Sequence, residues 1–489
     1  MNTSGILRYC GISLIGVSLL MMVSAGVAWH EKSEAAMVPL SYAGLMTAIV
    51  GLFPLIFVPR QKNIGMREGF FIVTFSWISA CIFGALPYMM FGGEFTLVNA
   101  LFESVSGFTT TGASILNDIE ALPNGLLFWR IASAWIGGIG IVTLVSLMIP
   151  ARNDVRSVLA SAECSDLARA GFSGRKKHFV YTMLSIYVGI TTITAVALRI
   201  CGMRWFDAVT HAMSACSTCG FSTRNASIAA FGSPGIELVL IVAMIMGGSN
   251  FALLRSTFMP CHNGRSIFKS EIFRTFILGI MAASVAVAAD LLLNGRSTSF
   301  TGALRQAVFQ IASISTTTGF ATADTDAWPA LSVAVLCLCS VFCGCTGSTS
   351  GGIKVDRALL AAKSMKSRLH SLAHPSHVMC VRIDGHIRRV EEVEDACIFI
   401  LFYLALTVAG GFINSAGGMD LRSGFSASMA CMGNVGPGFG SVGSMGNYSS
   451  LPDALKINSM ILMLLGRLEI YPFFLIFGDY NRKRVRYKA

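Results

Sequence analysis

Long apolar runs without a charged residue constrain this chain more than any other feature of its sequence. Each run approaches or exceeds the roughly 20 residues that cross a bilayer as an α-helix. The runs occupy residues 9–29, 35–59, 69–91, 179–198 and 396–419. Of the 489 residues, 54% are hydrophobic and 13% are charged, whereas an ordinary soluble domain has about 25% charged residues. A soluble protein is therefore excluded, and the sequence predicts an all-α polytopic membrane protein.

The net charge of +11 is distributed unevenly along the chain. Six basic segments hold 27 of the 37 Lys and Arg residues and alternate with connections that are poor in both. The basic segments are 1–8, 59–68, 150–178, 255–274, 354–392 and 481–489. This alternation is typical of a membrane protein whose basic loops, here including the C-terminus, stay in the cytoplasm. The charge therefore indicates topology and contact with the lipid bilayer, and it does not indicate a nucleic-acid partner.

Four short polar segments, each built around a glycine, recur between the apolar runs. The pivotal glycines are Gly112, Gly220, Gly319 and Gly436. Their separations of 108, 99 and 117 residues indicate an internal repeat of about a hundred residues. Each segment follows an apolar stretch that is too short to span a bilayer and is predicted to be a re-entrant helix. These stretches are 99–108, 206–217, 304–316 and 424–432.

The repeats divide the chain into an N-terminal helix pair and four units of helix, re-entrant helix, polar loop and second helix. The helix pair is assigned to 1–62 and the repeats to 63–165, 166–262, 263–375 and 376–489, the last with a basic cytoplasmic tail. All four units enter the membrane from a basic loop, so they share one orientation. Parallel repeats are related by an axis along the membrane normal, and their polar loops are expected to converge on one central path.

The four loops have the composition expected of an ion filter. An ion that enters hydrocarbon must exchange its hydration water for other oxygen atoms, and backbone carbonyls supply these without adding fixed charge. Glycine permits the backbone dihedrals that turn successive carbonyls inward. The predicted filter residues are Thr110, Thr111, Gly112, Thr218, Cys219, Gly220, Thr317, Thr318, Gly319, Asn434, Val435 and Gly436. Nine residues before the pivotal glycines stand Glu103, His211, Gln310 and Ala427, so three repeats have a polar residue at one helical depth.

With these loops, the sequence resembles the Trk/Ktr/HKT superfamily of potassium transport proteins, and most of all the bacterial Trk-type uptake subunit. The resemblance includes the two leading helices, the four loops, and motifs at 135–138, 344–352 and 466–472. It implies that potassium is the transported ion, K+, bound at the filter residues. In this family, serine at the glycine of the first filter loop is associated with sodium transport. Because that residue is Gly112 here, the resemblance implies a preference for potassium.

The resemblance also implies a gate below the filter. In the family, the broken helix of the third repeat forms an intramembrane loop, and an arginine of the last helix projects toward the same path. Here the gate residues are Gly344, Cys345, Thr346, Gly347, Ser348, Thr349, Ser350, Gly351, Gly352 and Arg467. Independently, an arginine near a cation path raises the barrier by repulsion. Arg467 could also form an internal bond with Glu469 or a carbonyl, and the two roles can coexist.

Two loops depart from the family pattern. Cys219 stands where the family more often has glycine, and the fourth loop contains Pro437 and Phe439, which leaves the site geometry of repeats 2 and 4 open. Acidic residues that follow the first and third loops could concentrate cations at an outer mouth, or could be ordinary solvated loop charges. These residues are Asp118, Glu120, Asp324 and Asp326.

The prediction is a multi-pass potassium uptake protein of the bacterial cytoplasmic (inner) membrane. The family implies a homodimer and a cytosolic nucleotide-binding regulatory ring. No organic cofactor is expected in this chain, which lacks the phosphate-cradling GxxxxGK[ST] motif. Two alternatives stay open: a symporter driven by protons or sodium, and a sodium-permeable relative. A proton relay would need intramembrane acids or histidines, for which Glu103, His211, Asp290 and Glu469 are the candidates.

An enzyme is not predicted. The sequence has no Ser-His-Asp pattern, no HExxH motif and no paired metal-ligand spacing. The cysteines lie mostly inside apolar stretches, where they are expected to be small buried hydrophobic residues.

Overall fold

The structure, a computed structural model, describes residues 3–59, 66–140, 177–258, 266–374 and 380–470. Within these residues, six helical segments are long and apolar enough to cross a membrane. They are α1 (Thr3–His30), α2 (Glu34–Phe57), α3 with α4 (Met66–Gly84 and Leu86–Phe91), α10 (Lys177–Ile200), α14 (Glu271–Leu293) and α18 (Val390–Ala416). Most of the basic segment 150–178 and the whole tail at 481–489 lie outside the described residues. The predicted helical, multi-pass fold is confirmed.

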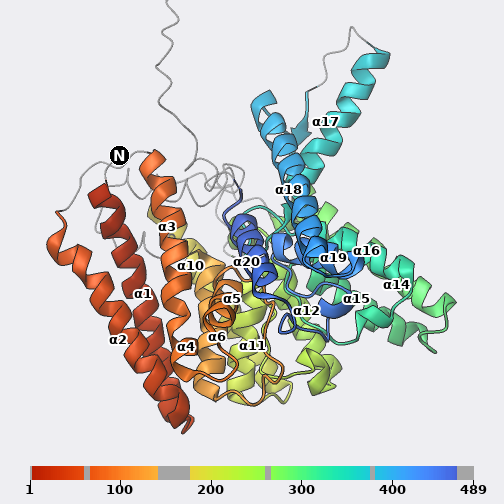
Figure 1. The fold of residues 1–489 in the computed structure, drawn as a ribbon. Helices are drawn as coiled ribbons and strands as arrows, with labels where there is room; N and C mark the ends of the chain where they lie inside the picture. Colours follow the sequence, from red (N-terminus) through yellow and green to blue (C-terminus); the bar gives the residue numbers. More distant parts are fainter. Residues whose placement is uncertain (1–2, 60–65, 141–176, 259–265, 375–379, 471–489) are drawn as a thin grey trace, which may run out of the picture.

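Helices α1 and α2 form a hairpin at one edge of the helical body, where they pack against α3 and α6 (Asn124–Ile139) (Figure 1). Small residues let the two main chains approach each other. A Cβ atom on Gly11 would lie 2.6 Å from the carbonyl oxygen of Gly51, and the Ser18 hydroxyl donates to the Gly44 carbonyl at 2.7 Å. Such contacts replace the hydrophobic driving force between helices, which is absent in lipid.

Four short helices lie where the sequence predicts re-entrant helices. They are α5 (Leu97–Phe108), α11 (Trp205–Ser217), α15 (Phe300–Ser315) and α19 (Leu421–Gly433). Three of them begin at a side chain that accepts a hydrogen bond from a backbone amide of the first turn, namely Thr96, Ser299 and Asp420. The hydrogen bond from Ser423 also holds the pKa of Asp420 below its usual value. Each short helix runs directly into its polar loop, so the loops begin at a fixed depth.

The second helix of each repeat is short or broken. These helices are α6, α12 (Pro234–Gly247) with α13 (Phe251–Phe258), α16 (Ala330–Val341) with α17 (Val355–Ala373), and α20 (Asp453–Arg467). Helices α12 and α13 meet at a bend of 110°. Between α16 and α17, the ends of the glycine-rich segment pair as parallel strands β1 (Phe342–Cys343) and β2 (Ile353–Lys354).

The fold is not purely helical. Besides β1 and β2, strands β3 (Arg382–Ile383) and β4 (His386–Ile387) form an antiparallel pair. Both sheets have strands of two residues, which are too short to give an alternating pattern in the sequence. Four 3-10 turns complete the described elements: η1 (Ser227–Phe231), η2 (Ile267–Lys269), η3 (Thr325–Ala327) and η4 (Gly440–Val442).

Glycines of the second helices press against the ends of the short helices. A Cβ atom on Gly137 would overlap the Phe108 carbonyl oxygen, and one on Gly466 would overlap the Met432 carbonyl oxygen. Gly247 lies against the Cys216 carbonyl, and the Gly344 amide donates to the Ser315 carbonyl at 3.0 Å. All four carbonyls stand four residues before a pivotal glycine. These glycines therefore let the outer helices hold the loops at the centre.

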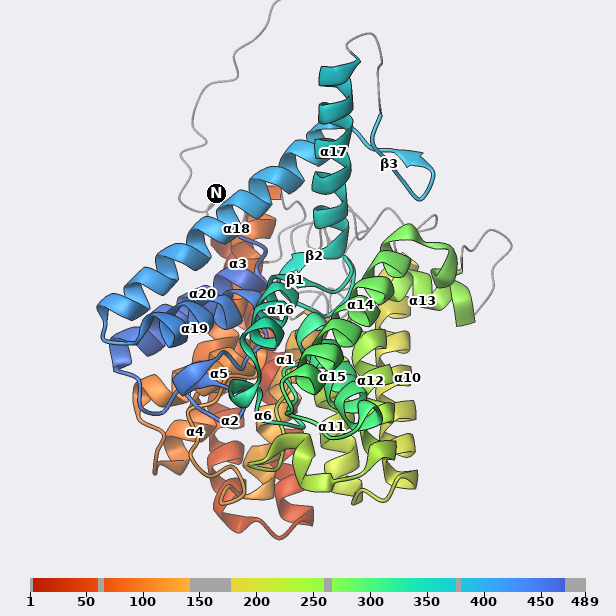
Figure 2. The same ribbon diagram turned by 90° about the vertical axis from the view of Figure 1, so that its right-hand side faces the viewer.

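Helices α17 and α18 extend beyond the rest of the helical body (Figure 2). The β3–β4 hairpin lies between them in the chain and packs back on the start of α14 through Asp384, which accepts hydrogen bonds from Ser270 and from the Glu271 amide. This projection carries the basic segment 354–392. By the predicted topology it lies on the cytoplasmic side.

The glycine contacts predict a stability difference between two Gly→Ala variants. Gly137→Ala places a methyl group against the Phe108 carbonyl and is expected to lower the free energy of unfolding by about 1–3 kcal/mol. The matched control is Gly189→Ala in α10, where a Cβ atom would meet nothing within 4 Å. Thermal unfolding of the purified protein in detergent measures both. Equal midpoints for the two variants would contradict the packing role of Gly137.

Candidate functional site

The four polar loops begin with the same backbone geometry. The residue two before each pivotal glycine has a left-handed backbone with φ between 53° and 59°. These residues are Thr110, Thr218, Thr317 and Asn434. The pivotal glycines have positive φ as well, between 78° and 95°, while the residue between the two has negative φ. This alternation turns successive carbonyl oxygens toward the same side of the strand.

Two backbone hydrogen bonds fix the start of each loop to the end of its short helix. In the first repeat, the Thr110 amide donates to the Gly107 carbonyl at 2.8 Å, and the Thr111 amide donates to the Ser106 carbonyl at 2.9 Å. The same two bonds recur in the other three loops. This is a Schellman helix end, in which glycine usually takes the left-handed position. Threonine takes it in three loops here, at a cost on the order of 1–3 kcal/mol each, so the surroundings impose the conformation.

The pivotal glycines contact neighbouring loops in a closed ring. At each pivotal glycine, an added Cβ atom would overlap a carbonyl oxygen of the following loop, and for the fourth loop the partner is the first. In every case that carbonyl belongs to the residue just before the partner loop's own pivotal glycine. The four contacts are Gly112 to Cys219, Gly220 to Thr318, Gly319 to Val435, and Gly436 to Thr111. The structure therefore brings the four predicted loops together around one centre, in chain order, with space for no side chain at the pivotal positions.

The three polar residues predicted at one helical depth hold the segments that follow their own loops. The bonds join Glu103 to the Ile115 amide (3.1 Å), His211 to the Ser222 hydroxyl (2.9 Å), and Gln310 to the Thr322 amide (2.9 Å). Gln310 accepts this bond with its amide oxygen turned toward the loop. Ala427 has no polar side chain, and in the fourth repeat Ser426 instead donates to the Phe439 carbonyl at 3.0 Å. The short helices therefore brace the loops from behind.

Beyond the ring, each loop is hydrogen-bonded to its neighbours. The bonds join the Ile119 amide to Asn225 (2.7 Å), the Ile228 amide to the Ala321 carbonyl (3.1 Å), the Thr325 amide to Ser444 (3.1 Å), and the Tyr448 amide to the Ser114 carbonyl (2.8 Å). Since these four bonds follow the order of the repeats, the loops are linked into a second closed circuit. Irregular backbone near a membrane needs such internal partners.

The four acidic residues predicted near an outer mouth have protein partners. The partners are Asn225 for Asp118 (2.8 Å), Arg224 for Glu120 (3.3 Å), the Asp326 amide for Asp324 (3.0 Å), and Arg422 for Asp326 (3.1 Å). The Asn225 hydrogen bond holds the pKa of Asp118 below its usual value. These hydrogen bonds and ion pairs fix the four acidic side chains to the loops.

A cavity of about 180 Å³ lies at the end of the ring that the predicted topology places on the outer side. All four pivotal glycines line it, together with residues that follow them, including Arg130 and Arg224. A water molecule takes up about 30 Å³ in the liquid, so the cavity has space for several waters or for a partly hydrated ion.

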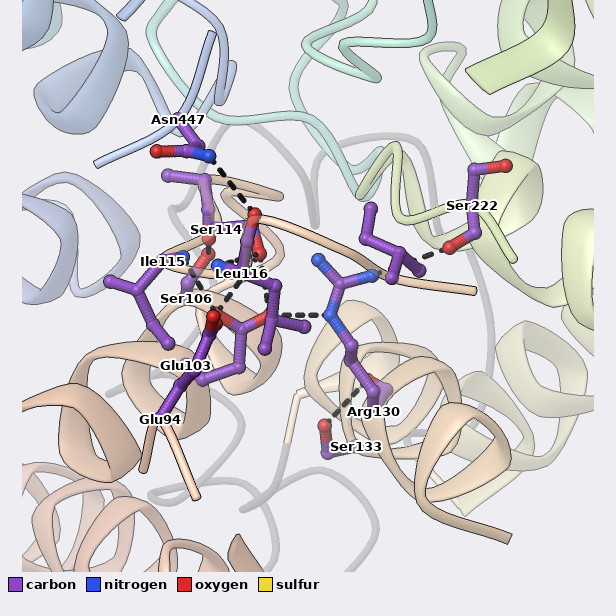
Figure 3. Close-up of polar contacts among 12 residues, drawn as sticks. Glu94, Glu103, Ser106, Ser114, Ile115, Leu116, Arg130, Ser133, Ser222 and Asn447 are labelled. Carbon is purple, nitrogen blue, oxygen red and sulfur yellow. Dashed lines mark hydrogen bonds and ion pairs between the residues drawn. The ribbon is translucent and has the colours of Figure 1, made fainter. Parts of the chain in front are cut away.

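Arg130 is a candidate residue that sequence reasoning missed. It lies on α6 with 1% of its side chain exposed, forms an ion pair with Glu103, and places its guanidinium carbon 3.5 Å from the ring centroid of Phe221. Figure 3 shows the Arg130 side chain between Glu103 and Ser222. The available signal was an arginine in an apolar stretch, because ionisable residues at membrane depth are functional candidates by default.

The glycine-rich segment 344–352 lies directly below the ring. The Gly351 amide donates to the Thr317 hydroxyl at 3.0 Å, and the Thr218 hydroxyl lies 3.3 Å from that of Thr349. Its backbone is also bonded to the break between α12 and α13, where the Cys345 amide donates to the Gly248 carbonyl at 2.8 Å. The predicted gate residues thus touch the left-handed residues of two loops.

Arg467 reaches the same segment from the end of α20. It donates to the Thr349 carbonyl and to the Gly137 carbonyl, both at 2.6 Å. Of the two alternatives considered for its internal bond, the carbonyl is therefore the partner seen. Glu469 pairs instead with Arg357 on α17 at 2.6 Å. Arg467 links the third repeat's loop to the first repeat's second helix, next to the predicted path.

Comparisons with known proteins give consistent matches along nearly the whole chain. The sequence profile of the TrkH family, described as a cation transport protein, matches residues 43–483. The Trk system potassium uptake protein TrkH of Escherichia coli K12 is 32% identical over 487 residues, covering 98% of this chain and 99% of that protein. The TrkG protein of the same strain is 30% identical over 498 residues, covering 98% of this chain and 99% of that protein.

The crystal structure of the potassium transporter TrkH from Vibrio parahaemolyticus has the same fold, with a TM-score of 0.88 and 30% identity. The alignment covers 98% of this chain and 99% of that chain. Taken with the apolar helices, these matches identify a multi-pass membrane protein of a transport family, and not an enzyme. The chain belongs to the TrkH family of cation transport proteins.

Proposed function

We propose that this chain carries out potassium uptake across the bacterial inner membrane, through a filter formed by the four glycine loops. The closed ring of contacts between pivotal glycines and neighbouring carbonyls is the observation that carries the proposal. The four loops have the same alternating backbone dihedrals and surround one centre, so their carbonyl oxygens can replace the water around a monovalent cation. Potassium is the ion named for the relatives from Escherichia and Vibrio.

The short helices add to the attraction for a cation. Each helix ends at its loop, so the partial negative charge of its C-terminus is directed toward the centre. Four such ends favour a positive ion without a carboxylate that would hold it too tightly. In the first repeat the charge of Glu103, the acid behind the loop, is balanced by Arg130. The proposed filter is therefore built from dipoles and not from fixed charges.

The gate in this proposal is the segment 344–352 together with Arg467. The segment lies against Thr218 and Thr317, the entry residues of two loops, and Arg467 holds it through the Thr349 carbonyl. A guanidinium beside a cation path opposes ion passage by repulsion. Releasing the carbonyl bonds of Arg467 would free both the charge and the segment to move.

A coupled symporter is the alternative function, and the surroundings of the candidate relay residues argue against it. Asp290 accepts from the Ser332 amide and hydroxyl at 2.9 and 2.6 Å, and Glu469 pairs with Arg357. Glu103 and His211 are the braces described above. Groups held this way serve structure and do not form a connected relay. Potassium flux that persists without a proton or sodium gradient would separate the channel-like function from the coupled one.

Partners are a further part of the proposal: a homodimer, and a cytosolic nucleotide-binding ring that regulates the gate. Helix α17 projects from the body and carries three exposed apolar side chains at helical spacing, Met365, Leu369 and Leu372, between 61% and 69% exposed. An exposed apolar stripe on a basic projection supports a protein partner there. The C-terminus is proposed to be cytoplasmic, with α17 on the same side.

Replacing Gly112 by serine tests the filter. The new Cβ atom would overlap the Cys219 carbonyl at a φ of 78°, so the ring must distort. We expect Gly112→Ser to lower potassium-over-sodium discrimination by roughly tenfold, equivalent to about 1.4 kcal/mol of differential binding. The readout is the ratio of rubidium to sodium flux into proteoliposomes.

Gly92→Ser is the matched control, because Gly92 has a φ of 79° and an added Cβ atom would meet nothing within 4 Å. It places a side chain at a positive φ outside the ring and should keep the wild-type flux ratio. If Gly112→Ser also keeps the wild-type ratio, the filter assignment is wrong.

Replacing Arg467 by alanine tests the gate. Losing three carbonyl bonds and a positive charge beside the path should raise basal rubidium flux severalfold when no regulatory partner is present. The control is Arg296→Ala, an exposed arginine in the loop after α14, which should leave basal flux unchanged. Equal or lower flux for Arg467→Ala at equal protein amount would remove Arg467 from the gate.

A further inference from the structure

The ion pair of Glu103 and Arg130 is fully buried beside the ring and belongs to the first repeat. The exposed fractions of the two side chains are 0% and 1%. Burying two charges costs several kcal/mol per ion unless both are paired and hydrogen-bonded, and here both conditions are met. A buried pair is weak evidence for stability by itself, so its contacts must indicate what it does.

Each member of the pair holds a different loop. Glu103 accepts hydrogen bonds from the Ile115 amide and the Ser114 hydroxyl, both at 3.1 Å, just after the first pivotal glycine (Figure 3). Arg130 stacks on the ring of Phe221 and its Nη1 donates to the Ser222 carbonyl at 3.4 Å, just after the second pivotal glycine. Through the ion pair, the two post-glycine segments are joined behind the ring.

The joined segments flank one particular ring contact. Gly112 meets the Cys219 carbonyl between loops 1 and 2, and both anchored segments start within two residues of these positions. A shift of either anchor would change the distance between the two loops at this contact. Sub-ångström shifts matter there, because no side chain is present to take up the change.

The other repeats have no equivalent pair. The positions that match Glu103 hold His211, Gln310 and Ala427, and the positions that match Arg130, eighteen residues after each pivotal glycine, hold Leu238, Cys337 and Ala454. Repeats 2 and 3 brace their own loops with neutral side chains. A neutral brace is therefore sufficient to hold one loop, and the charged pair has the additional effect of joining two.

We propose that Glu103 and Arg130 are positioning residues that set the spacing between loops 1 and 2, and through it the discrimination between potassium and sodium. The proposal rests on the proposed filter function. Removing one member leaves an unpaired charge beside the ring, which draws its loop toward water or another partner. Removing both charges leaves each loop with a neutral brace of its own, as in repeat 3, but nothing then joins the two loops.

A double-mutant cycle tests this proposal in the full chain reconstituted into liposomes. The variants are Glu103→Gln, Arg130→Met and the double variant, and the readout is the rubidium-to-sodium flux ratio, which does not depend on how much protein folds. We expect each single variant to lower the ratio by roughly tenfold and the double variant to lower it by about as much as either single variant, the non-additivity typical of two residues that act as one unit. Phe221→Leu removes the cation–π contact, keeps an apolar side chain at this buried position, and should lower the ratio less.

Glu237→Gln is the matched control, since Glu237 forms a two-point ion pair with Arg305 between α12 and α15, away from the loops. It should leave the flux ratio unchanged. Wild-type ratios in both single variants, a wild-type ratio in the double variant, or a double variant as poor as the two single losses combined would overturn the proposal. If the single variants do not fold, the double variant and Phe221→Leu decide: a lowered ratio in the double variant with a smaller loss in Phe221→Leu supports the proposal, and a wild-type ratio in the double variant overturns it. If Gly112→Ser changes the ratio and the pair variants do not, the proposal for the ion pair is wrong while the filter assignment stands.

Discussion

Close contact between each pivotal glycine and the next loop's carbonyl is the constraint on which the rest of the structure depends. The backbones of four loops can approach one axis only if no side chain lies between them. They stay there only if the surrounding helices pack against them from outside. Glycines at Gly137, Gly247 and Gly466 let the second helices reach the ends of the short helices. Glycine thus permits close backbone contact in two places, between neighbouring loops in the ring and between the second helices and the short helices behind it.

The ring is held in a conformation that its own sequence does not favour. Three left-handed threonines are strained, and the Schellman bonds, the braces behind the loops and the outer circuit of hydrogen bonds together offset that strain. The repeats share this backbone but differ in side chains. Repeat 1 carries a buried ion pair, repeat 3 a broken second helix, and repeat 4 the arginine that reaches the break. The proposed gate and the proposed role of the ion pair both lie in these departures from symmetry.

Much of this could be predicted from the sequence, because the strongest signals were periodic. Charge-free runs located five of the six long apolar helical segments, and four glycines at similar separations located the loops to within a few residues; α14 has no such run because it carries Arg274 and Asp290. The pair β1–β2 was missed because two-residue strands leave no pattern. Arg130 was missed because a single arginine in a helix carries no motif, and its importance depends on Glu103 and Phe221, which lie 27 and 91 residues away in the chain. Pairings of that kind are set by tertiary packing.

Anomalous diffraction from crystals grown in rubidium measures where a potassium-like ion binds. If main-chain oxygens of the four loops replace its hydration shell, anomalous peaks will lie on the axis enclosed by the carbonyls of Thr111, Cys219, Thr318 and Val435. Rubidium peaks found only outside that ring, or four loops that do not surround a common axis in the ion-bound crystal, would contradict the account.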